Sequence, residues 1–363
     1  MSVPRLEPVA ALLEAAHREG IAPALSAAVR WGGRLVHASV HGDAQVLPER
    51  RPAGPRTLFD VASLTKVMAT TSLAALLADA GVLDLDAPAR RFLPELPSDK
   101  AALTPRLLLA HAGGLPAWLP LHAGARRPED VIAAAAAAPL LAPPGTRAVY
   151  SDLGFILLGA LVERCGGALL DAAFEGRVAG PLGLCSTFFL REGSSSAVER
   201  RARREFAATR RTADRGLIAG VVDDDNAFAM GGVAGHAGLF STAEEVAQLG
   251  QGWLDALAGR SSWLSTATAA RFAARDATPD SERALGWDTP AREGSSLGGR
   301  FGRGPRGAVG HLGFTGCSLW LDLDGEVACA LLTNHVHPDG PDKVRLKALR
   351  ARFHDTVAEA LGS

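Results

Sequence analysis

The chain has 363 residues, of which 47% are apolar and 21% are charged, with 40 Gly and 22 Pro. This composition is typical of a folded globular protein and excludes a disordered or collagen-like chain; the length suits two or three domains or one large catalytic unit in two parts. With 38 basic and 39 acidic side chains the formal net charge is −1, so no overall positive field attracts nucleic acid or an anionic membrane. We therefore expect a small-molecule partner, with no nucleic acid, no membrane and no obligate protein partner.

The N-terminal part of the chain predicts a helix, a β-hairpin and a second helix in that order. An apolar helical period covers residues 6–18. Two apolar runs, 23–31 and 34–40, flank Gly32-Gly33, a pair that suits a two-residue hairpin turn. From residue 62 to residue 80 the pattern is helical again and rich in Ala and Leu.

The rest of the chain is dominated by helix patterns until a second hairpin near the end. The predicted elements are helices at residues 104–110, 128–138, 154–165 and 343–361 and a hairpin of residues 318–322 and 326–333. Strands near both ends that enclose helices predict an α/β (α+β) fold, with an antiparallel sheet flanked by helices in one discontinuous domain of residues 1–85 and 230–363. A mostly helical subdomain of residues 86–229 is inserted into it, and we expect the active site at the junction.

Cysteine usage and the N-terminal sequence bear on the compartment. The four cysteines have no C-x-x-C spacing and lie in apolar surroundings, which favours buried free thiols and a reducing compartment. The N-terminus lacks a charged segment followed by an apolar one, and the longest apolar stretch, residues 131–142, is shorter than the roughly 20 residues that span a membrane. We expect a cytoplasmic protein without a signal peptide.

Several well-known sites are absent from the sequence. There is no G-x-S-x-G elbow, no Walker loop, no H-E-x-x-H and no paired cysteine ligands. One G-x-G-x-x-G occurs at residues 302–307, but it contains Pro305 and does not run from a strand into a helix, so we attribute it to chance. The eight Arg of residues 191–215 are interpreted as a solvated face, and the Gly/Arg-rich residues 292–306 as a loop bordering the site.

The tetrapeptide Ser63-Leu64-Thr65-Lys66 lies at the start of the second predicted helix. Positions i and i+3 share one helix face, so the Lys66 amine and the Ser63 hydroxyl are neighbours. A serine hydroxyl is a weak nucleophile that needs an adjacent base, and a desolvated lysine can have its pKa lowered enough to serve. The helix N-terminus adds backbone N–H groups for a developing oxyanion. By itself, S-x-x-K is a weak signal that more often marks a helix N-cap serine followed by an exposed lysine.

A second motif, Tyr150-Ser151-Asp152, leads into a helix, where Ser151 or Asp152 can act as the N-cap. If the Tyr150 phenol lies near Lys66, the cation can hold it partly ionised, and it can then shuttle a proton between Ser63 and a leaving group. The motif is therefore a candidate for acid–base chemistry.

A third motif, residues 310–316 with the sequence GHLGFTG, directly precedes the last hairpin. Its glycines allow a substrate to approach the backbone closely, and the Phe314 N–H can complete an oxyanion hole with that of Ser63. A lone His such as His311 is more often structural than catalytic, so the motif gains weight only beside the other two.

In the order S-x-x-K, Y-x-D, H-x-G, the three motifs resemble those of the serine β-lactamase-like superfamily. The resemblance is to the branch of class C β-lactamases, D-alanyl-D-alanine peptidases and family VIII-type esterases, and it spans most of the chain from about Leu58 to Pro338. Residues 107–116 are similar to the family's L-L-x-H-T-S-G-L. Residues 225–226 and 231–241 are similar to a penicillin-binding-protein-4B-like subgroup.

The resemblance implies a β-lactamase/transpeptidase-like fold and a role for each matching residue. Ser63 is the acylated nucleophile and Lys66 and Tyr150 are the base pair. His311 completes the catalytic set and stands where class C β-lactamases have Lys. A permanent cation there pairs with the substrate carboxylate, whereas His at pH 7 is mostly neutral, so we expect β-lactams to be slow substrates at best. The substrate-binding and oxyanion set comprises Asp152, in the place often held by Asn, with Gly313 and Phe314.

We expect a serine hydrolase that cleaves a small ester or a D-amino-acid-type amide through an acyl-enzyme on Ser63, without a metal or organic cofactor. Two alternatives stay open: a D-alanyl-D-alanine carboxypeptidase or penicillin-binding protein with slow β-lactam turnover, and a non-hydrolytic penicillin-binding sensor. Outside the catalytic set, we interpret His111 and His236 as structural and Trp118 and Trp287 as packing residues or cleft walls.

Overall fold

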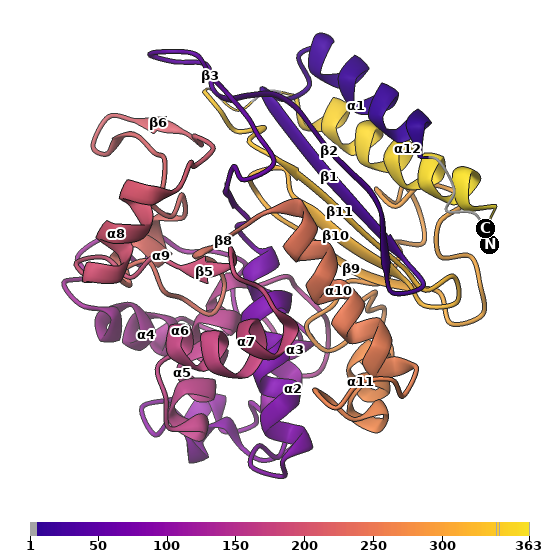
Figure 1. The fold of residues 1–363 in the computed structure, drawn as a ribbon. Helices are drawn as coiled ribbons and strands as arrows, with labels where there is room; N and C mark the ends of the chain where they lie inside the picture. Colours follow the sequence, from indigo (N-terminus) through magenta and orange to yellow (C-terminus); the bar gives the residue numbers. More distant parts are fainter. Residues whose placement is uncertain (1–5, 339, 341, 363) are drawn as a thin grey trace.

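The computed structural model describes residues 6–338, 340 and 342–362, and its centre is a six-stranded antiparallel sheet (Figure 1). The strand order is β3-β2-β1-β11-β10-β9. In the central pair, Leu25 lies opposite Thr333 and Trp31 opposite Val327, which joins the two predicted hairpins in one sheet. The strands are β1 (Ala24–Trp31), β2 (Arg34–Gln45), β3 (Arg51–Pro52), β9 (Ala308–Leu312), β10 (Ser318–Asp322) and β11 (Val327–Thr333).

Both faces of the sheet are covered, which explains why β11 is apolar at every position before Thr333. Side chains of β11 alternate between two cores, since Cys329 and Leu331 face one apolar cluster and Ala330 and Leu332 face the other. On the first face lie α1 (Glu7–Arg18) and α12 (Lys343–Leu361), side by side. The opposite face is covered by α10 (Ala243–Leu257), which also contacts α11 (Thr266–Ala273).

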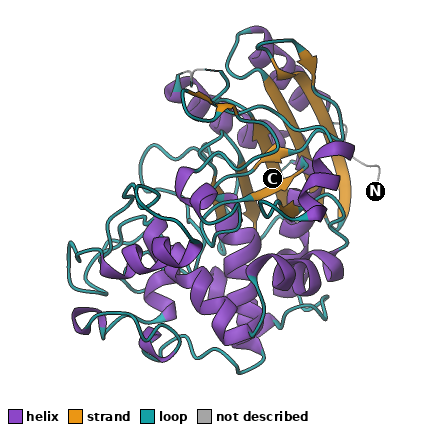
Figure 2. Cartoon of the chain, turned by 90° about the vertical axis from the view of Figure 1, so that its left-hand side faces the viewer, coloured by secondary structure: helices purple, strands orange, loops and turns teal. Residues whose placement is uncertain are grey.

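The remaining helices gather beyond α10, away from the sheet (Figure 2). Helix α5 is their centre: residues 153–162 are buried, and α2, α3, α4 and α6 pack around it. The helices of this part are η1 (Lys66–Thr71), α2 (Ser72–Asp79), η2 (Ala89–Arg91), η3 (Ser98–Lys100), α3 (Pro105–Leu109), α4 (Pro128–Ala137), α5 (Asp152–Gly166), α6 (Leu170–Phe174), η4 (Glu175–Ala179), α7 (Gly180–Leu182), α8 (Ser195–Arg203) and α9 (Asp225–Ala229).

Two smaller sheets complete the fold. The three-stranded one has the order β4-β8-β5 and consists of β4 (Phe59–Asp60), β8 (Leu239–Ser241) and β5 (Phe188–Phe189). The other is a short hairpin of β6 (Arg211–Thr212) and β7 (Gly216–Leu217). The first of these matters for function, because β4 leads directly into the segment that contains Ser63.

The predicted α/β fold is confirmed, and the differences lie in individual elements. Residues 308–312 form the edge strand β9, so His311 lies on a strand and not before one. Helices α10 and α11 are additional to the prediction. Of the cysteines, Cys317 and Cys329 are buried free thiols as expected, but Cys185 is exposed and Cys165 half-buried because both lie at the outer surface of the helical part. The division into two domains stays a prediction.

Among the described residues, no single helix is long and apolar enough to cross a membrane. Only α5 taken together with residues 170–182 reaches the required length and hydropathy, and these two segments are bent by 72°.

Candidate active site

The nucleophile candidate Ser63 lies on a turn between β4 and a helical segment. The residue before it, Ala62, has φ of +48°, a conformation that non-glycine residues rarely adopt. The Asp60 carboxylate holds this turn by accepting the Ala62 N–H at 2.8 Å. The helical segment then includes the π-helical η1, a form that often occurs at functional sites.

Lys66 is fully buried, and its ammonium group joins the three segments of the site. Its Nζ lies 3.0 Å from Ser63 Oγ, 2.7 Å from Asp152 Oδ1 and 3.0 Å from the carbonyl oxygen of His236. Burial by itself lowers the pKa of Lys66, but the charges and hydrogen bonds of Asp152 and Tyr150 outweigh burial and raise it above its ordinary value. The resting amine is therefore protonated, and it becomes a base only after losing a proton.

Lys66 Nζ lies over the Tyr150 ring, 4.9 Å from the ring centroid, and the phenol interacts with Lys66 and Ser63. Burial raises the pKa of the phenol, and this outweighs the lowering by Lys66. Burial, with a smaller contribution from the charge of Asp152, thus favours the neutral phenol in the resting enzyme, where the sequence led us to expect a partly ionised one. In this structure the phenol is a proton donor.

Helix α5 positions the Y-x-D motif. Ser151 is its N-cap, accepting the Gly154 N–H, and Asp152 is the first helical residue. The loop before the helix is held by His111, whose Nδ1 accepts the Ser151 N–H at 3.0 Å and whose ring stacks on Tyr150 at 4.6 Å. His111 thus has the structural role predicted for it.

His311 is buried on β9, with its ring centroid 5.9 Å from that of Tyr150. Its Nδ1 lies 2.8 Å from the Leu312 carbonyl oxygen, so this nitrogen carries the proton and Nε2 is the acceptor. Burial, followed by the charges of Lys66 and Arg283, holds the pKa of His311 well below its usual value. His311 is therefore neutral at pH 7, whereas a lysine at this position would be charged. This agrees with what we expected from the sequence.

Gly313 and Phe314 bring a backbone amide to the nucleophile. The Gly313 N–H bonds the Cys317 carbonyl at 2.7 Å, closing a turn, and a Cβ at Gly313 would lie 2.6 Å from the Val61 carbonyl. Only glycine allows this turn to approach the Ser63 segment so closely. Neither the Ser63 nor the Phe314 N–H donates a hydrogen bond to any described residue, so both are available to an oxyanion.

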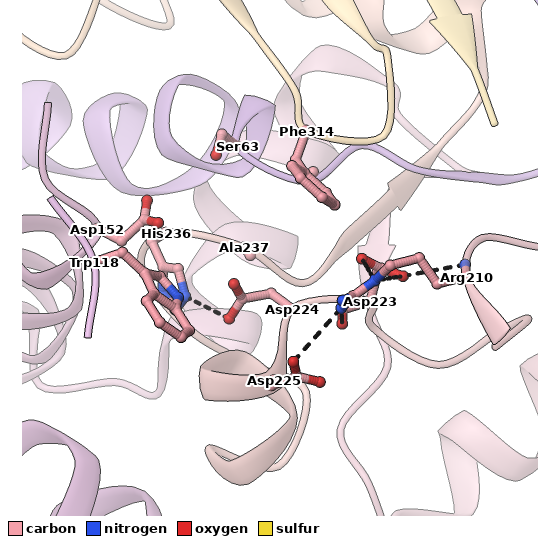
Figure 3. Close-up of a pocket in the computed structure, with 11 residues that line it drawn as sticks. Ser63, Trp118, Asp152, Arg210, Asp223, Asp224, Asp225, His236, Ala237 and Phe314 are labelled. Carbon is pink, nitrogen blue, oxygen red and sulfur yellow. Dashed lines mark hydrogen bonds and ion pairs between the residues drawn. The ribbon is translucent and has the colours of Figure 1, made fainter. Parts of the chain in front are cut away.

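A cavity of about 370 Å³ opens in front of Ser63 (Figure 3). Trp118 and Phe314 are its exposed aromatic walls, and the polar lining comes from the loop of residues 223–225 with Arg210 and His236. This size is that of a small-molecule site, with aromatic walls and a few fixed polar groups.

The polar groups of the cavity hold one another in place. Arg210 donates to Asp223 at 2.9 Å and lies 3.6 Å from Asp225. His236 Nε2 lies 2.8 Å from Asp224 Oδ1. Burial raises the pKa of Asp224, but His236 and the Ala227 N–H outweigh burial and hold it below its usual range.

The structure brings all the predicted site residues together, and it adds others. Ser63, Lys66, Tyr150, Asp152 and His311 form one connected cluster, with Gly313 and Phe314 beside it. Sequence analysis missed Arg210, which belongs to the Arg-rich stretch interpreted as a solvated face. It also missed Asp223 and Asp224, and it used the neighbouring Asp225 only for the family resemblance. His236 lines the cavity in addition to bonding Asp224. Trp118 is a cleft wall, whereas Trp287 is buried against Trp253 in the core.

No group of three or more His, Cys, Asp or Glu side chains in the described part of the chain is arranged to hold a metal ion. The chemistry of the site as described belongs to its serine, amine and phenol.

The fold and this cluster define a serine hydrolase with the architecture of β-lactamases. A family model described as Beta-lactamase matches residues 9–352. The protein belongs to this family.

Similar proteins include an N-acetylmuramyl-L-alanine amidase from Bacillus subtilis, 34% identical over 343 residues, covering 84% of this chain and 75% of the relative. An Escherichia coli protein with the provisional name D-alanyl-D-alanine carboxypeptidase is 31% identical over 340 residues, covering 85% and 75%. Among solved structures, EstCE1, a hydrolase with promiscuous acyltransferase activity, superposes with a TM-score of 0.73 at 24% identity, covering 97% of this chain and 98% of EstCE1.

Proposed function

We propose that the protein is a serine hydrolase that works through an acyl-enzyme on Ser63. The observation that supports this most directly is the buried Lys66 amine, 3.0 Å from Ser63 Oγ and 2.7 Å from Asp152. In its neutral form, Lys66 takes the proton from Ser63 as Oγ attacks a carbonyl carbon. The two free amides of Ser63 and Phe314 stabilise the oxyanion.

Collapse of the tetrahedral intermediate expels the leaving group, which takes a proton from Tyr150. The phenol recovers this proton from Lys66, whose Nζ lies 4.9 Å from the Tyr150 ring centroid. Water then attacks the acyl-enzyme, and the same groups return the proton to Ser63. Each step uses a side chain that already touches Ser63 or Lys66.

We infer a small ester or a D-amino-acid-type amide as the substrate, with β-lactams turned over slowly. The neutral His311 supports slow β-lactam turnover, because it lacks the cation that would pair with the drug's carboxylate. The name of the amidase relative adds a natural candidate outside these two classes, an N-acetylmuramyl amide of L-alanine. The cavity beside Ser63, with an aromatic wall at Trp118 and carboxylates at residues 223–225, offers the stacking surface and hydroxyl acceptors that a sugar-containing acyl group requires.

A direct test is steady-state turnover of four substrates by the wild type and by Ser63→Ala. The substrates are p-nitrophenyl acetate, p-nitrophenyl butyrate, N-acetylmuramyl-L-alanine and a diacylated D-alanyl-D-alanine peptide. We expect Ser63-dependent turnover of both esters and of at least one amide. Turnover that survives Ser63→Ala, or none with any of the four, contradicts the proposal.

The second candidate is a D-alanyl-D-alanine carboxypeptidase that also reacts with penicillin, which the name of the Escherichia coli relative favours. A fluorescent penicillin separates the two functions. A long-lived adduct on Ser63 together with release of D-alanine supports the carboxypeptidase, whereas rapid ester turnover with little adduct supports the first proposal.

A further inference from the structure

A second cavity, of about 380 Å³, lies between the start of α12 and the loop of residues 289–296. It is rich in cations: Arg283, Lys343, Lys347 and Arg350 line it, against the carboxylates of Glu282 and Asp288. One of these carboxylates is already used, since Asp288 is ion-paired with Arg283.

Arg350 is a buried cation without a carboxylate partner among the described residues. It is 8% exposed, and one of its terminal nitrogens donates to the carbonyls of Gly313 at 3.3 Å and Cys317 at 2.9 Å. Its Nε has no hydrogen-bond partner. Burial lowers the pKa of Arg350 to about 10, so it stays charged at neutral pH. A buried charge that the fold leaves uncompensated is costly, and an anionic ligand removes that cost.

Other donors converge on the same cavity. The indole Nε1 of Trp320, a buried residue that lines it, also lacks a partner. Lys343 and Lys347 lie one turn apart on α12 and are exposed, and no described carboxylate lies within ion-pair distance of either ammonium group. The cavity therefore presents unused donors from three kinds of side chain and an excess of positive charge.

Contacts link this second cavity to the catalytic cluster. The Arg283 guanidinium lies 5.4 Å from the Tyr150 ring centroid, and Lys343 Nζ lies 5.6 Å from that of Phe314. Arg350 also bonds the Gly313 carbonyl, next to the free Phe314 amide. Phe314 therefore lines the first cavity and also lies beside Lys343 of the second, so the cationic cavity adjoins the catalytic cluster.

We propose that the cationic cavity binds the leaving group of the substrate and selects one with two carboxylates, such as glutamate or an acidic peptide. This rests on the proposed function, because it assigns the first cavity to the acyl group. Lys343, Lys347 and Arg350 carry three positive charges, and Glu282 offsets one of them. The two positive charges that remain match a ligand with two carboxylates. Because His311 is neutral, the positive charge that binds the carboxylates comes from Lys343, Lys347 and Arg350 of α12.

Acyl transfer tests the site, because an amine acceptor enters where a leaving amine departs. With p-nitrophenyl butyrate as donor, the acceptor nitrogen attacks the butyryl-enzyme, the bond from the acyl carbon to Ser63 Oγ breaks, Oγ regains a proton and the amine loses one. The acceptors are alaninamide, alanine and glutamate, which carry no, one and two carboxylates respectively. Both enantiomers of each are used, and transfer is compared per unprotonated amine. We expect transfer to increase in that order.

Substitution of the two exposed lysines should weaken this preference. Lys343→Gln and Lys347→Gln should each reduce the glutamate-to-alaninamide ratio about two- to fivefold, the range for partly exposed ion pairs, and the double variant by about tenfold. Arg345→Gln is the matched control, because it removes a charge from the same helix but its partner is Glu19. The p-nitrophenyl ester turnover of Arg345→Gln should equal that of the wild type, because Arg345 lines neither cavity.

A second measurement does not depend on catalysis. Glutarate, a dicarboxylate, should raise the melting temperature of the wild type and of Arg345→Gln but not of the double lysine variant. The anion site is overturned by equal transfer to all acceptors, or by transfer to none while Ser63-dependent ester turnover persists. A glutarate effect that survives in the double variant overturns it as well. Absence of Ser63-dependent ester turnover in the wild type instead overturns the proposed function, and the glutarate result then decides the anion site alone.

Discussion

At the scale of single residues, the ionisation of Lys66 controls the site. Asp152 lies 2.7 Å from its Nζ and stabilises the ammonium form. Since only the neutral amine can accept the Ser63 proton, the carboxylate favours the inactive ionisation state at low pH. The ion pair holds the amine in place but shifts activity toward alkaline pH.

Asp152→Asn should therefore lower the pKa of Lys66 and move the acid limb of the pH profile for kcat/KM to lower pH. The measurement is the pH dependence of p-nitrophenyl butyrate hydrolysis. Asp225→Asn is a suitable control, because it removes a carboxylate of the same cavity that pairs with Arg215 and not with Lys66. An unmoved acid limb, or one moved to higher pH, contradicts this assignment.

At the scale of elements, two close approaches place the nucleophile against the oxyanion turn. A Cβ at Gly313 would lie 2.6 Å from the Val61 carbonyl and 3.2 Å from Cys317 Cβ. Gly313→Ala should cost about 1–3 kcal/mol of stability through overpacking and should lower kcat more than it raises KM, because the Phe314 amide moves. Gly299→Ala, where only one atom comes as near as 4.0 Å, is the control. Wild-type kcat in Gly313→Ala would show that the turn does not supply the oxyanion amide.

The second close approach brings the turn at Ala62 next to the loop at Asp223. Asp60 holds the two together by accepting the N–H groups of both residues. Burial, followed by the charge of Asp223, raises the pKa of Asp60 to about 7. A folded-state pKa above the unfolded value means that the folded protein binds more protons, so this carboxyl stabilises the fold at low pH and loses that contribution as pH rises through 7.

Urea unfolding of the wild type and of Asp60→Asn between about pH 5 and pH 8 measures this effect. Because Asn does not titrate, we expect the stability of Asp60→Asn relative to the wild type to increase with pH. A difference that is independent of pH would mean that Asp60 is already ionised throughout the range.

Elements with clear local patterns could be predicted from the sequence, and α12 begins and ends where the pattern placed it. Helix α10 carries comparable signals, an N-cap at Thr242 and acidic residues in its first turn, and it was predictable in the same way. Strand β9 was not, because five residues in a glycine-rich stretch acquire their conformation only by pairing with β10.

The candidate site shows the same division. Ser63, Lys66 and Tyr150 belong to local motifs, so sequence alone identified them. Arg210 and Arg350 became visible only in the structure, because their positions depend on how distant segments pack. A count of arginines cannot show which of them lacks a carboxylate.

At the scale of the whole molecule, the sheet is stabilised on one face by α1 and α12, which come from opposite ends of the chain. Leu13 of α1 is fully buried there and lines neither cavity. Leu13→Ala should reduce the free energy of unfolding by about 2–5 kcal/mol, measured by urea denaturation, with unchanged turnover per folded molecule. A loss below 1 kcal/mol would contradict close packing of α1 on the sheet.

The acyl-enzyme on Ser63 is the central claim, and rapid-quench intact-protein mass spectrometry tests it most directly. Wild-type protein mixed with p-nitrophenyl butyrate should gain the mass of one butyryl group, which peptide mapping should locate on Ser63 and which should decay as butyrate is released. Ser63→Ala should show neither the adduct nor the turnover. Ester turnover that persists in Ser63→Ala, or an adduct on another residue, would contradict the account.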